Sequence, residues 1–252
     1  DTLKDCKKAN LNKNKIHKNT IASLGLAGGR SKKHRNLLKS RINFFKEIII
    51  STDGYIALAG TSATKTVAIL NIGTGVVAHL ILKNNLSQQI SGWGYPHGDK
   101  GGGWWIGSRL VAETLKSIDG YIDKDFIFQK ILKKIGNKDV KILNWLSNAK
   151  SKDLAELVSI LFNNKKKSKI SHKIINEGVE EIEMILKYIL KNKNIQKIYC
   201  TGGLSIFYKP YLKKNFSKYL VYDKVDPLLG ALLISKKKFP IEQLINDNRA
   251  YF

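Results

Sequence analysis

Hydrophobic positions in the first part of the chain follow two periodicities. Short apolar runs bounded by Gly, Ser or Asp are typical of buried strands, and apolar residues three and four positions apart are typical of helices. Residues 1–19 have little periodicity and are expected to form a loop or a frayed helix. The pattern after them predicts two strand–helix pairs, with strands at residues 20–27 and 47–51 and helices at residues 31–42 and 54–59.

From residue 66 the pattern changes to apolar strands joined by short turns. Turn sequences at residues 73–75 and 84–85 predict three antiparallel strands in a row. Helical spacing follows, and then strands and helices alternate. The expected helices are 104–118, 123–135, 138–149, 152–164, 169–191, 207–215 and 226–235, with strands at 195–200 and 219–222.

This order of elements predicts an α/β protein whose mixed sheet is covered by helices. Residues 61–236 contain hairpins followed by alternating strands and helices, which makes a complete domain. Residues 1–60 contain only strand, helix, strand and helix, which is the second half of the same pattern. Residues 237–252 are expected to be a tail that packs back on the first domain. We therefore expect an incomplete first lobe followed by a complete second lobe.

The net charge of +24 raises the possibility of a nucleic-acid partner. Nearly all the basic residues are lysines, scattered along the chain beside many Asn and Ile residues, as expected of an A+T-rich coding sequence. Side chains that read phosphates and bases with two hydrogen bonds are usually Arg. Nucleic acid is therefore not the partner we expect, and a basic nucleic-acid-binding protein is kept only as a lesser alternative.

The cysteines and the apolar runs indicate the cellular compartment in which we expect the protein. Cys6 and Cys200 are far apart and belong to no CxxC or Cys/His cluster, so we expect no disulfide framework, no metal site and a cytoplasmic location. No apolar run approaches the ~20 residues that span a bilayer, and no signal peptide opens the chain. Because Met184 is the only methionine, we expect residues upstream of Asp1 to have been removed or left out.

Two segments could hold a nucleotide. In the turn at Gly73, Thr74 and Gly75, converging backbone N–H groups and a hydroxyl suit a phosphate, although an ordinary hairpin turn has the same sequence. The glycines after the strand at 195–200 allow a planar base or ribose to approach the backbone, although a plain turn is as good an interpretation. This second segment is Thr201, Gly202 and Gly203.

Two further segments could hold a substrate. Asp53 follows a buried strand, where α/β proteins place ligand-contacting residues, and could accept a proton or help to hold Mg²⁺; the alternative is a helix cap before Gly54. Stacking rings and a carboxylate suit a sugar, and the alternative is a flexible loop before a buried helix. The residues of this sugar segment are Gly92, Trp93, Gly94 and Asp99.

A series of motifs resembles the N-acetylglucosamine and glucosamine kinases within the BadF/BadG/BcrA/BcrD ATPase family. In chain order, these motifs are an Asp after a strand, GTG, a GWG loop, TGG and DPLLGALL. The resemblance covers about residues 20–235, and its most specific part is GWGYPHGDKGGGWWIG. It implies an RNase H-like (actin-like ATPase) fold whose two lobes close on ATP, with Mg²⁺, and an amino sugar.

The resemblance also implies a role for each matching residue. Asp53 would be the catalytic base, and Gly73, Thr74 and Gly75 would hold the ATP tail. Gly92, Trp93, Gly94 and Asp99 would bind the sugar. Thr201, Gly202 and Gly203 would lie near the adenosine.

The chain departs from the family pattern in three places. No DGGGTKT-like first phosphate loop precedes residue 20, Lys100 stands where a carboxylate is usual, and residues 163–168 replace a nucleotide-contacting segment. The expected function is an ATP-dependent amino-sugar kinase, truncated and inactive in this form unless upstream residues supply the loop. The alternative is a non-catalytic sugar- or nucleotide-binding sensor. A homodimer is left open.

Overall fold

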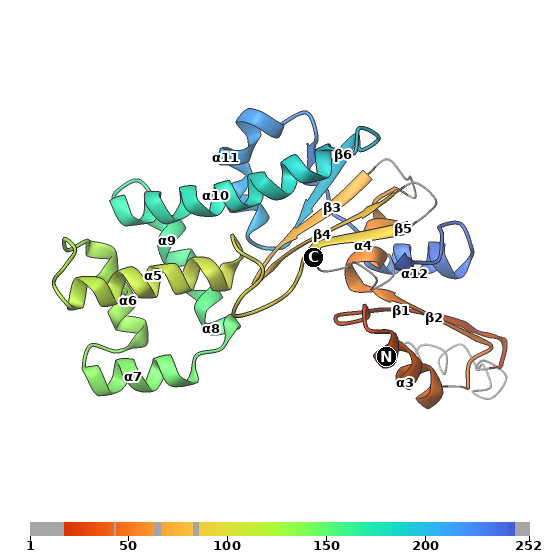
Figure 1. The fold of residues 1–252 in the computed structure, drawn as a ribbon, viewed down its shortest axis with the longest axis horizontal. Helices are drawn as coiled ribbons and strands as arrows, with labels where there is room; N and C mark the ends of the chain where they lie inside the picture. The colour runs from red at the N-terminus through yellow and green to blue at the C-terminus, as the bar shows by residue number, and fades with distance from the viewer. Residues whose placement is uncertain (1–17, 43, 63–66, 83–85, 245–252) are drawn as a thin grey trace, which may run out of the picture. The chain divides into compact units, whose positions relative to one another are not determined.

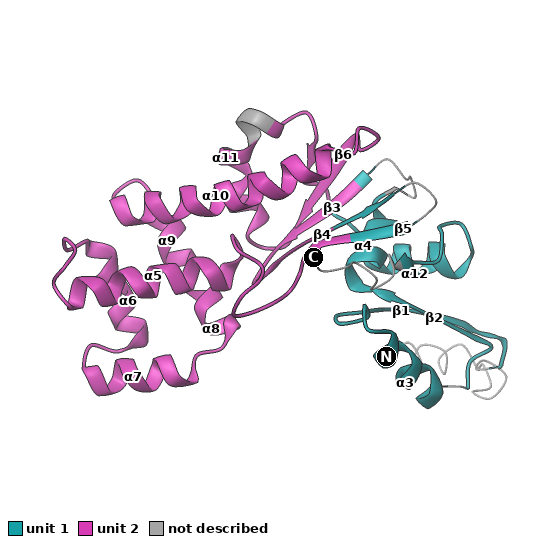
Figure 2. Cartoon of the chain, in the orientation of Figure 1, with its two compact units in different colours: residues 1–67, 79–88, 224–252 teal, residues 68–78, 89–223 magenta. Residues whose placement is uncertain are grey.

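The computed structural model describes residues 18–42, 44–62, 67–82 and 86–244 (Figure 1). Residues 1–17 of the expected N-terminal loop and the turn at 84–85 lie outside these ranges. The chain forms two compact units (Figure 2). Unit 1 contains residues 1–67, 79–88 and 224–252, and unit 2 contains residues 68–78 and 89–223.

Unit 1 is built on a pair of parallel strands with helices around it. Strand β1 pairs with β2 so that Ile21 lies opposite Glu47 and Leu26 lies opposite Thr52. Helix α12 packs on α4, where a Cβ atom added at Gly230 would lie 1.9 Å from the Ile56 carbonyl oxygen, so this crossing requires a glycine. The elements are β1 (Ile21–Leu26), α3 (Lys32–Arg41), β2 (Glu47–Thr52), α4 (Asp53–Ser62) and α12 (Pro227–Ser235).

The principal sheet has six strands in the order β7-β6-β3-β4-β5-β8. Three neighbouring strands of this sheet, β3, β4 and β5, follow one another in the sequence, as the turn signals predicted. The edge strand β8 was not predicted; it pairs in parallel with β5, with Leu86 opposite Gln243. The strands are β3 (Val67–Ile72), β4 (Val76–Ile81), β5 (Leu86–Ser91), β6 (Lys197–Thr201), β7 (Leu220–Val221) and β8 (Gln243–Leu244).

The helices of unit 2 pack around α5, which contacts α8 and α10. The single helix expected at residues 152–164 is wrong, because the structure has two short helices that meet at Leu157. Leu154 packs so closely on α5 that its carbonyl oxygen would lie 2.0 Å from a Cβ at Gly107, and this tertiary contact overrides the local helical periodicity. The helices are α5 (Gly103–Ile118), α6 (Phe126–Ile135), α7 (Asp139–Asn148), α8 (Ser151–Glu156), α9 (Val158–Asn163), α10 (Lys169–Leu190) and α11 (Ser205–Phe216).

The α/β class with a mixed sheet flanked by helices is therefore confirmed. Two predicted helix starts also agree with the structure: the Ser31 hydroxyl oxygen accepts from the His34 N–H before α3, and Asp226 caps α12. Among the described residues, no helix is long and apolar enough to cross a membrane.

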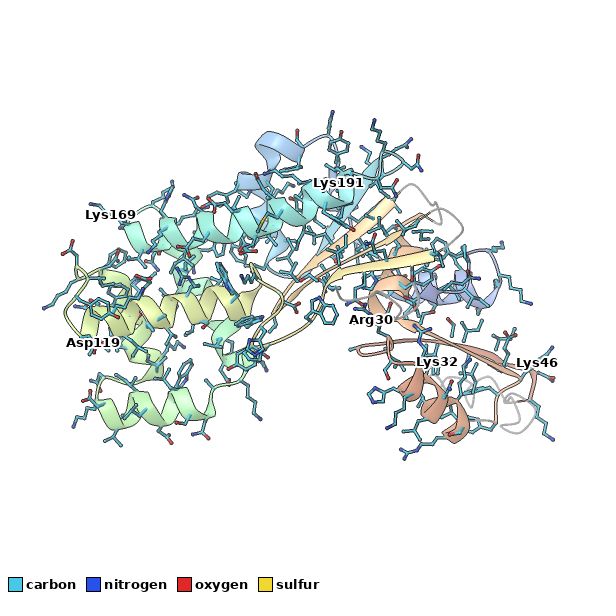
Figure 3. All side chains as sticks on the ribbon, in the orientation of Figure 1. Arg30, Lys32, Lys46, Asp119, Lys169 and Lys191 are labelled. Atoms are coloured by element: carbon cyan, nitrogen blue, oxygen red, sulfur yellow. The ribbon has the colours of Figure 1, made fainter. Side chains whose placement is uncertain are left out.

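Basic side chains lie on several separate elements. Lys32 is in α3 and Lys46 immediately precedes β2, while Lys169 and Lys191 lie at the two ends of α10 (Figure 3). The labelled lysines therefore do not come from one helix or one strand.

Candidate functional site

The phosphate hairpin, residues 73–75, is held by the first turn of α5. Within the turn, the Gly73 N–H donates to the Gly75 carbonyl at 2.9 Å. The Gly103 N–H donates to the Gly73 carbonyl at 2.8 Å, and the Trp104 N–H donates to the Thr74 carbonyl at 2.9 Å. The helix thus uses two of its otherwise unpaired N-terminal donors to fix the hairpin backbone. The Thr74 side chain remains exposed.

The segment after β6 lies against the same hairpin region. Gly202 has φ +85°, and a Cβ there would lie 2.4 Å from both the Asn71 side-chain oxygen and the Ile72 carbonyl oxygen. The Leu204 N–H donates to the Ile72 carbonyl at 2.9 Å. The structure therefore brings the two predicted nucleotide segments together.

A cavity of about 470 Å³ in unit 2 lies where these two segments and α5 meet. Gly73, Gly103 and Gly203 form part of its border, and glycines allow a ligand to approach the main chain closely. Helices α8 and α9 form part of its wall. The residues that line it are Gly73, Thr74, Gly103, Ala155, Glu156, Val158, Ser159, Gly203, Leu204 and Phe207.

The glycine loop around Asp99 is anchored at several points. The hydroxyl of the fully buried Tyr208 donates to the Gly101 carbonyl at 2.9 Å, and the Ser91 hydroxyl donates to Asp99 Oδ1 at 3.4 Å. Asp99 itself has φ +61°. A Cβ at Gly75 would lie 2.3 Å from Asp99 Oδ2, so this carboxylate packs directly on the phosphate hairpin. The sugar segment and the phosphate hairpin are therefore neighbours in unit 2.

The tryptophans near this loop have different surroundings. Trp93 is 64% exposed, whereas Trp104 is buried in α5 with Tyr95 edge-on to it at a centroid distance of 5.2 Å. Arg109 lies over the Trp105 ring, 5.9 Å from its centroid. Among these three rings, only Trp93 is open enough to stack on a ligand. Beside it is a cavity of about 320 Å³, lined by the loop and by α10 residues that include Glu181 and Tyr188.

Asp53 lies in unit 1, at the first position of α4 and directly after β2. Its side chain is exposed, and its Oδ1 atom accepts from the Gly54 N–H at 2.9 Å. The Thr52 hydroxyl oxygen, rather than Asp53, accepts from the Tyr55 N–H at 3.2 Å in the manner of a helix cap. The Asp53 carboxylate is thus held at the end of a buried strand with its outer face in solvent.

His79 is a neighbour of Asp53 that was not predicted as a site residue. It is 2% exposed on β4, and a Cβ at Gly54 would lie 2.0 Å from its Nε2 atom. Burial lowers the pKa of His79 from its usual 6.5 to about 4; the negative charge of Asp53 acts in the opposite direction, and Arg30 acts with burial. The imidazole is therefore neutral at pH 7. Its sequence signal was a single polar residue inside the apolar run 76–82.

Metal-binding side chains are sparse in the described ranges. These ranges contain no group of three or more His, Cys, Asp or Glu side chains that could hold an ion. Cys200 is buried and its pKa is raised to about 12 by burial, so it is neither a nucleophile nor a ready metal ligand at neutral pH.

Comparison with known proteins decides the family. The BadF/BadG/BcrA/BcrD ATPase family matches residues 2–235. The chain belongs to the BadF/BadG/BcrA/BcrD ATPase family. This family member is 27% identical over 234 residues to the N-acetylmuramic acid/N-acetylglucosamine kinase of Clostridium acetobutylicum, a match that covers 85% of the chain and 76% of that protein. It is 24% identical over 225 residues to the glucosamine kinase GspK of Vibrio cholerae, over 89% of the chain and 75% of that protein.

Solved structures agree on the fold of this BadF/BadG-family chain. A provisionally named N-acetylglucosamine kinase from Chromobacterium violaceum superposes with a TM-score of 0.75 at 23% identity, over 85% of the chain and 75% of that structure. A second provisionally named N-acetylglucosamine kinase, from Porphyromonas gingivalis, gives a TM-score of 0.59 at 15% identity, over 80% of the chain and 71% of that structure. These two structures share the α/β fold that the sequence predicted.

Proposed function

We propose that this protein transfers the γ-phosphoryl group of ATP to an amino sugar, either N-acetylglucosamine or glucosamine. The observation that supports the proposal best is the cavity in unit 2 where the phosphate hairpin, the start of α5 and Gly203 meet. Its size and the three glycines on its border suit a nucleotide whose phosphates lie against the hairpin. The kinase names of the relatives give the proposal its substrate class.

In this proposal, the Thr74 hydroxyl and the hairpin amides hold the ATP tail. The carbonyls of Gly73 and Thr74 accept from the first amides of α5, so the hairpin is fixed before ATP arrives. Such preorganised donors stabilise a phosphoryl group more than mobile ones because they need no reorientation during transfer. The Gly203 backbone would lie along the adenosine.

The residues present fit Mg²⁺ that arrives with ATP. Mg²⁺ is usually held by one or two carboxylates together with phosphate oxygens and water, so a cluster of protein ligands is not needed. Asp99 has a carboxylate beside the phosphate hairpin, in the same unit. Mg²⁺ would neutralise charge on the phosphates during transfer.

The proposed chemistry places Asp53 as the base. A hydroxyl oxygen of the sugar forms a bond to the γ-phosphorus, the bond from that phosphorus to the β–γ bridging oxygen breaks, and ADP leaves. The hydroxyl proton passes to the Asp53 carboxylate, which accepts it because its outer face is exposed. Asp99 and Trp93 would hold the sugar, the first by accepting from hydroxyls and the second by stacking.

The test is a coupled ADP-release assay on the protein as its native cell makes it. N-acetylglucosamine or glucosamine should stimulate ADP release, and Asp53→Asn should lower kcat by about 10²–10⁴-fold with little change in the KM for ATP. The absence of stimulation by any hexosamine or hexose would rule out the proposed reaction.

Lys100 supports a second candidate function, a non-catalytic sugar sensor. It replaces the carboxylate of the family motif beside Asp99, and its ammonium group lies 3.9 Å from Glu181 in α10. A sensor would bind amino sugar without ATP turnover, and Asp99→Ala would abolish the binding. Calorimetric titration in the absence of ATP measures this binding.

A further inference from the structure

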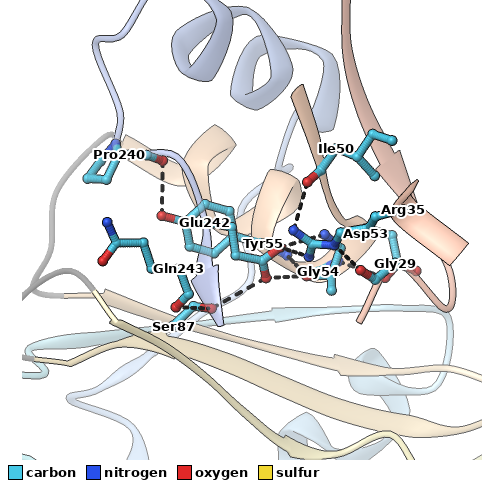
Figure 4. Close-up of polar contacts among 11 residues, drawn as sticks. Gly29, Arg35, Ile50, Asp53, Gly54, Tyr55, Ser87, Pro240, Glu242 and Gln243 are labelled. Atoms are coloured by element: carbon cyan, nitrogen blue, oxygen red, sulfur yellow. Dashed lines mark hydrogen bonds and ion pairs between the residues drawn. The ribbon is translucent and has the colours of Figure 1, made fainter. Parts of the chain in front are cut away.

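A buried carboxylate from the end of the described chain reaches the strand end that carries Asp53. The Glu242 side chain is 0% exposed, and the described residues that donate hydrogen bonds to it lie in unit 1 (Figure 4). Its Oε2 atom accepts from Arg35 Nη2 at 2.6 Å and from the Thr52 N–H at 2.8 Å. Its Oε1 atom accepts from the Thr52 hydroxyl at 2.8 Å and from the Ser87 hydroxyl at 3.4 Å.

Thr52 links this carboxylate to the start of α4. Its N–H and hydroxyl donate to the two oxygens of Glu242, so its position is fixed at two points. Its hydroxyl oxygen also accepts from the Tyr55 N–H, which places the first turn of α4. Asp53 lies between these two residues, so its Cα position depends on both sets of bonds.

Other contacts hold the segment around Glu242 to the same junction. The Tyr55 hydroxyl donates to the Pro240 carbonyl at 3.0 Å (Figure 4). The Tyr55 ring meets Phe239 edge-on, with 5.7 Å between the ring centroids. Arg35 also donates to the Ile50 carbonyl at 2.8 Å, within β2. The Arg35 and Glu242 side chains are 15% and 0% exposed, so the loss of either would leave the other charge buried without its partner.

We propose that Glu242 is a positioning residue that acts through Thr52 to set the place of the Asp53 carboxylate. The inference rests on the proposed kinase function, in which Asp53 accepts the proton of the sugar. Glu242 does not touch the substrate in this account. A displacement of a base by about 1 Å lowers the rate of transfer strongly, since proton transfer and in-line attack both need exact geometry.

The test uses the full protein with substitutions at Thr52. Thr52→Val keeps the shape of threonine but removes the hydroxyl that joins Glu242 to the Tyr55 N–H, and should lower kcat about 10-fold to 100-fold with the KM for ATP unchanged. Thr52→Ser keeps the hydroxyl and should restore kcat to within about twofold. Ser87→Ala is the matched control, because it also removes one hydroxyl from Glu242 but leaves Thr52 in place.

A second variant tests the contact between Thr52 and Glu242 by changing Glu242. Glu242→Asp keeps a negative charge for Arg35, but its side chain is shorter by one methylene group, so its carboxylate cannot keep all four hydrogen bonds. It should lower kcat about as much as Thr52→Val. Wild-type kcat in either folded variant would overturn the proposal.

Amide hydrogen exchange tests the positioning role of Glu242 independently of the proposed kinase function. If wild-type protein turns over no sugar, the kinase function fails, and exchange at Gly54 and Tyr55 still tests the positioning. Loss of protection at both amides in Thr52→Val, with protection kept in Thr52→Ser and Ser87→Ala, supports the positioning role. Unchanged protection in Thr52→Val contradicts it.

Discussion

Replacing Gly54 by Ala should force the buried imidazole of His79 out of its place. The added Cβ would lie 2.0 Å from His79 Nε2 and 2.1 Å from its Cδ2, whereas ordinary contacts begin near 3.4 Å. The ring would therefore have to move by about 1.4 Å in a site where it is 2% exposed. Overpacking of this kind costs about 1–3 kcal/mol, and the helix propensity of Ala offsets about 1 kcal/mol at most.

The expected net loss for Gly54→Ala is about 1–2 kcal/mol of unfolding free energy, or a fall in Tm of about 2–8 °C for a chain of this size. Urea denaturation of the variant and the wild type measures it. Gly203→Ala is the control: no atom lies within 4 Å of its added Cβ, so it should be neutral or slightly stabilising.

The double variant Gly54→Ala/His79→Ala shows whether the clash is the cause. With the imidazole removed, the alanine at position 54 should cost nothing, which gives a coupling energy of about 1–2 kcal/mol. An equal cost of Gly54→Ala with and without the ring would refute the reasoning, as would a Gly54→Ala variant as stable as the wild type.

Three further predictions concern pH, the buried ion pair and ATP. Burial lowers the pKa of His79 from 6.5 to about 4, so between these values the unfolded chain binds a proton at this residue and the folded chain does not. The free energy of unfolding should therefore fall by about 2 kcal/mol between pH 8 and pH 5, and His79→Leu should lose this component. An identical pH dependence in both proteins would contradict it. Glu242→Ala leaves Arg35 without its carboxylate and should cost about 3–5 kcal/mol of unfolding free energy. Lys187→Ala removes an ion pair in which the lysine side chain is 64% exposed, and should cost about 0.5 kcal/mol; equal losses in denaturant titrations would show that burial is not the cause. Thr74→Val should lower kcat/KM for ATP about tenfold without changing the KM for the sugar, and initial-rate kinetics that show the reverse would place Thr74 at the sugar instead.

Local sequence signals predicted most of the helices and strands, because the turns and caps that bound these elements depend on residues close together in the sequence. The glycine turn at 73–75 specifies a hairpin, and Ser31 and Pro227 mark helix starts that depend on neighbouring residues only. Strand β8 was missed because two residues carry no periodicity, and it forms only through its pairing with β5.

The polar groups around Asp53 could not be predicted from the sequence. Arg35 and Glu242 are 207 positions apart, and nothing near either residue indicates the other. His79 gave a weak signal as one polar residue in an apolar strand, but its neighbour Gly54 becomes evident only in the folded chain. Asp53 was predicted as a site residue because sequence patterns reveal the end of a buried strand, and its catalytic role stays a prediction.

The most direct test of the account is product identification by mass spectrometry. The protein as the native cell makes it would be incubated with ATP, Mg²⁺ and either N-acetylglucosamine or glucosamine, with Asp53→Asn as the control. The account predicts a phosphorylated amino sugar formed in equal amount to ADP, and at least about 100-fold less of it in the same time with the Asp53→Asn variant. ADP without sugar phosphate, or no product with either sugar, would contradict it.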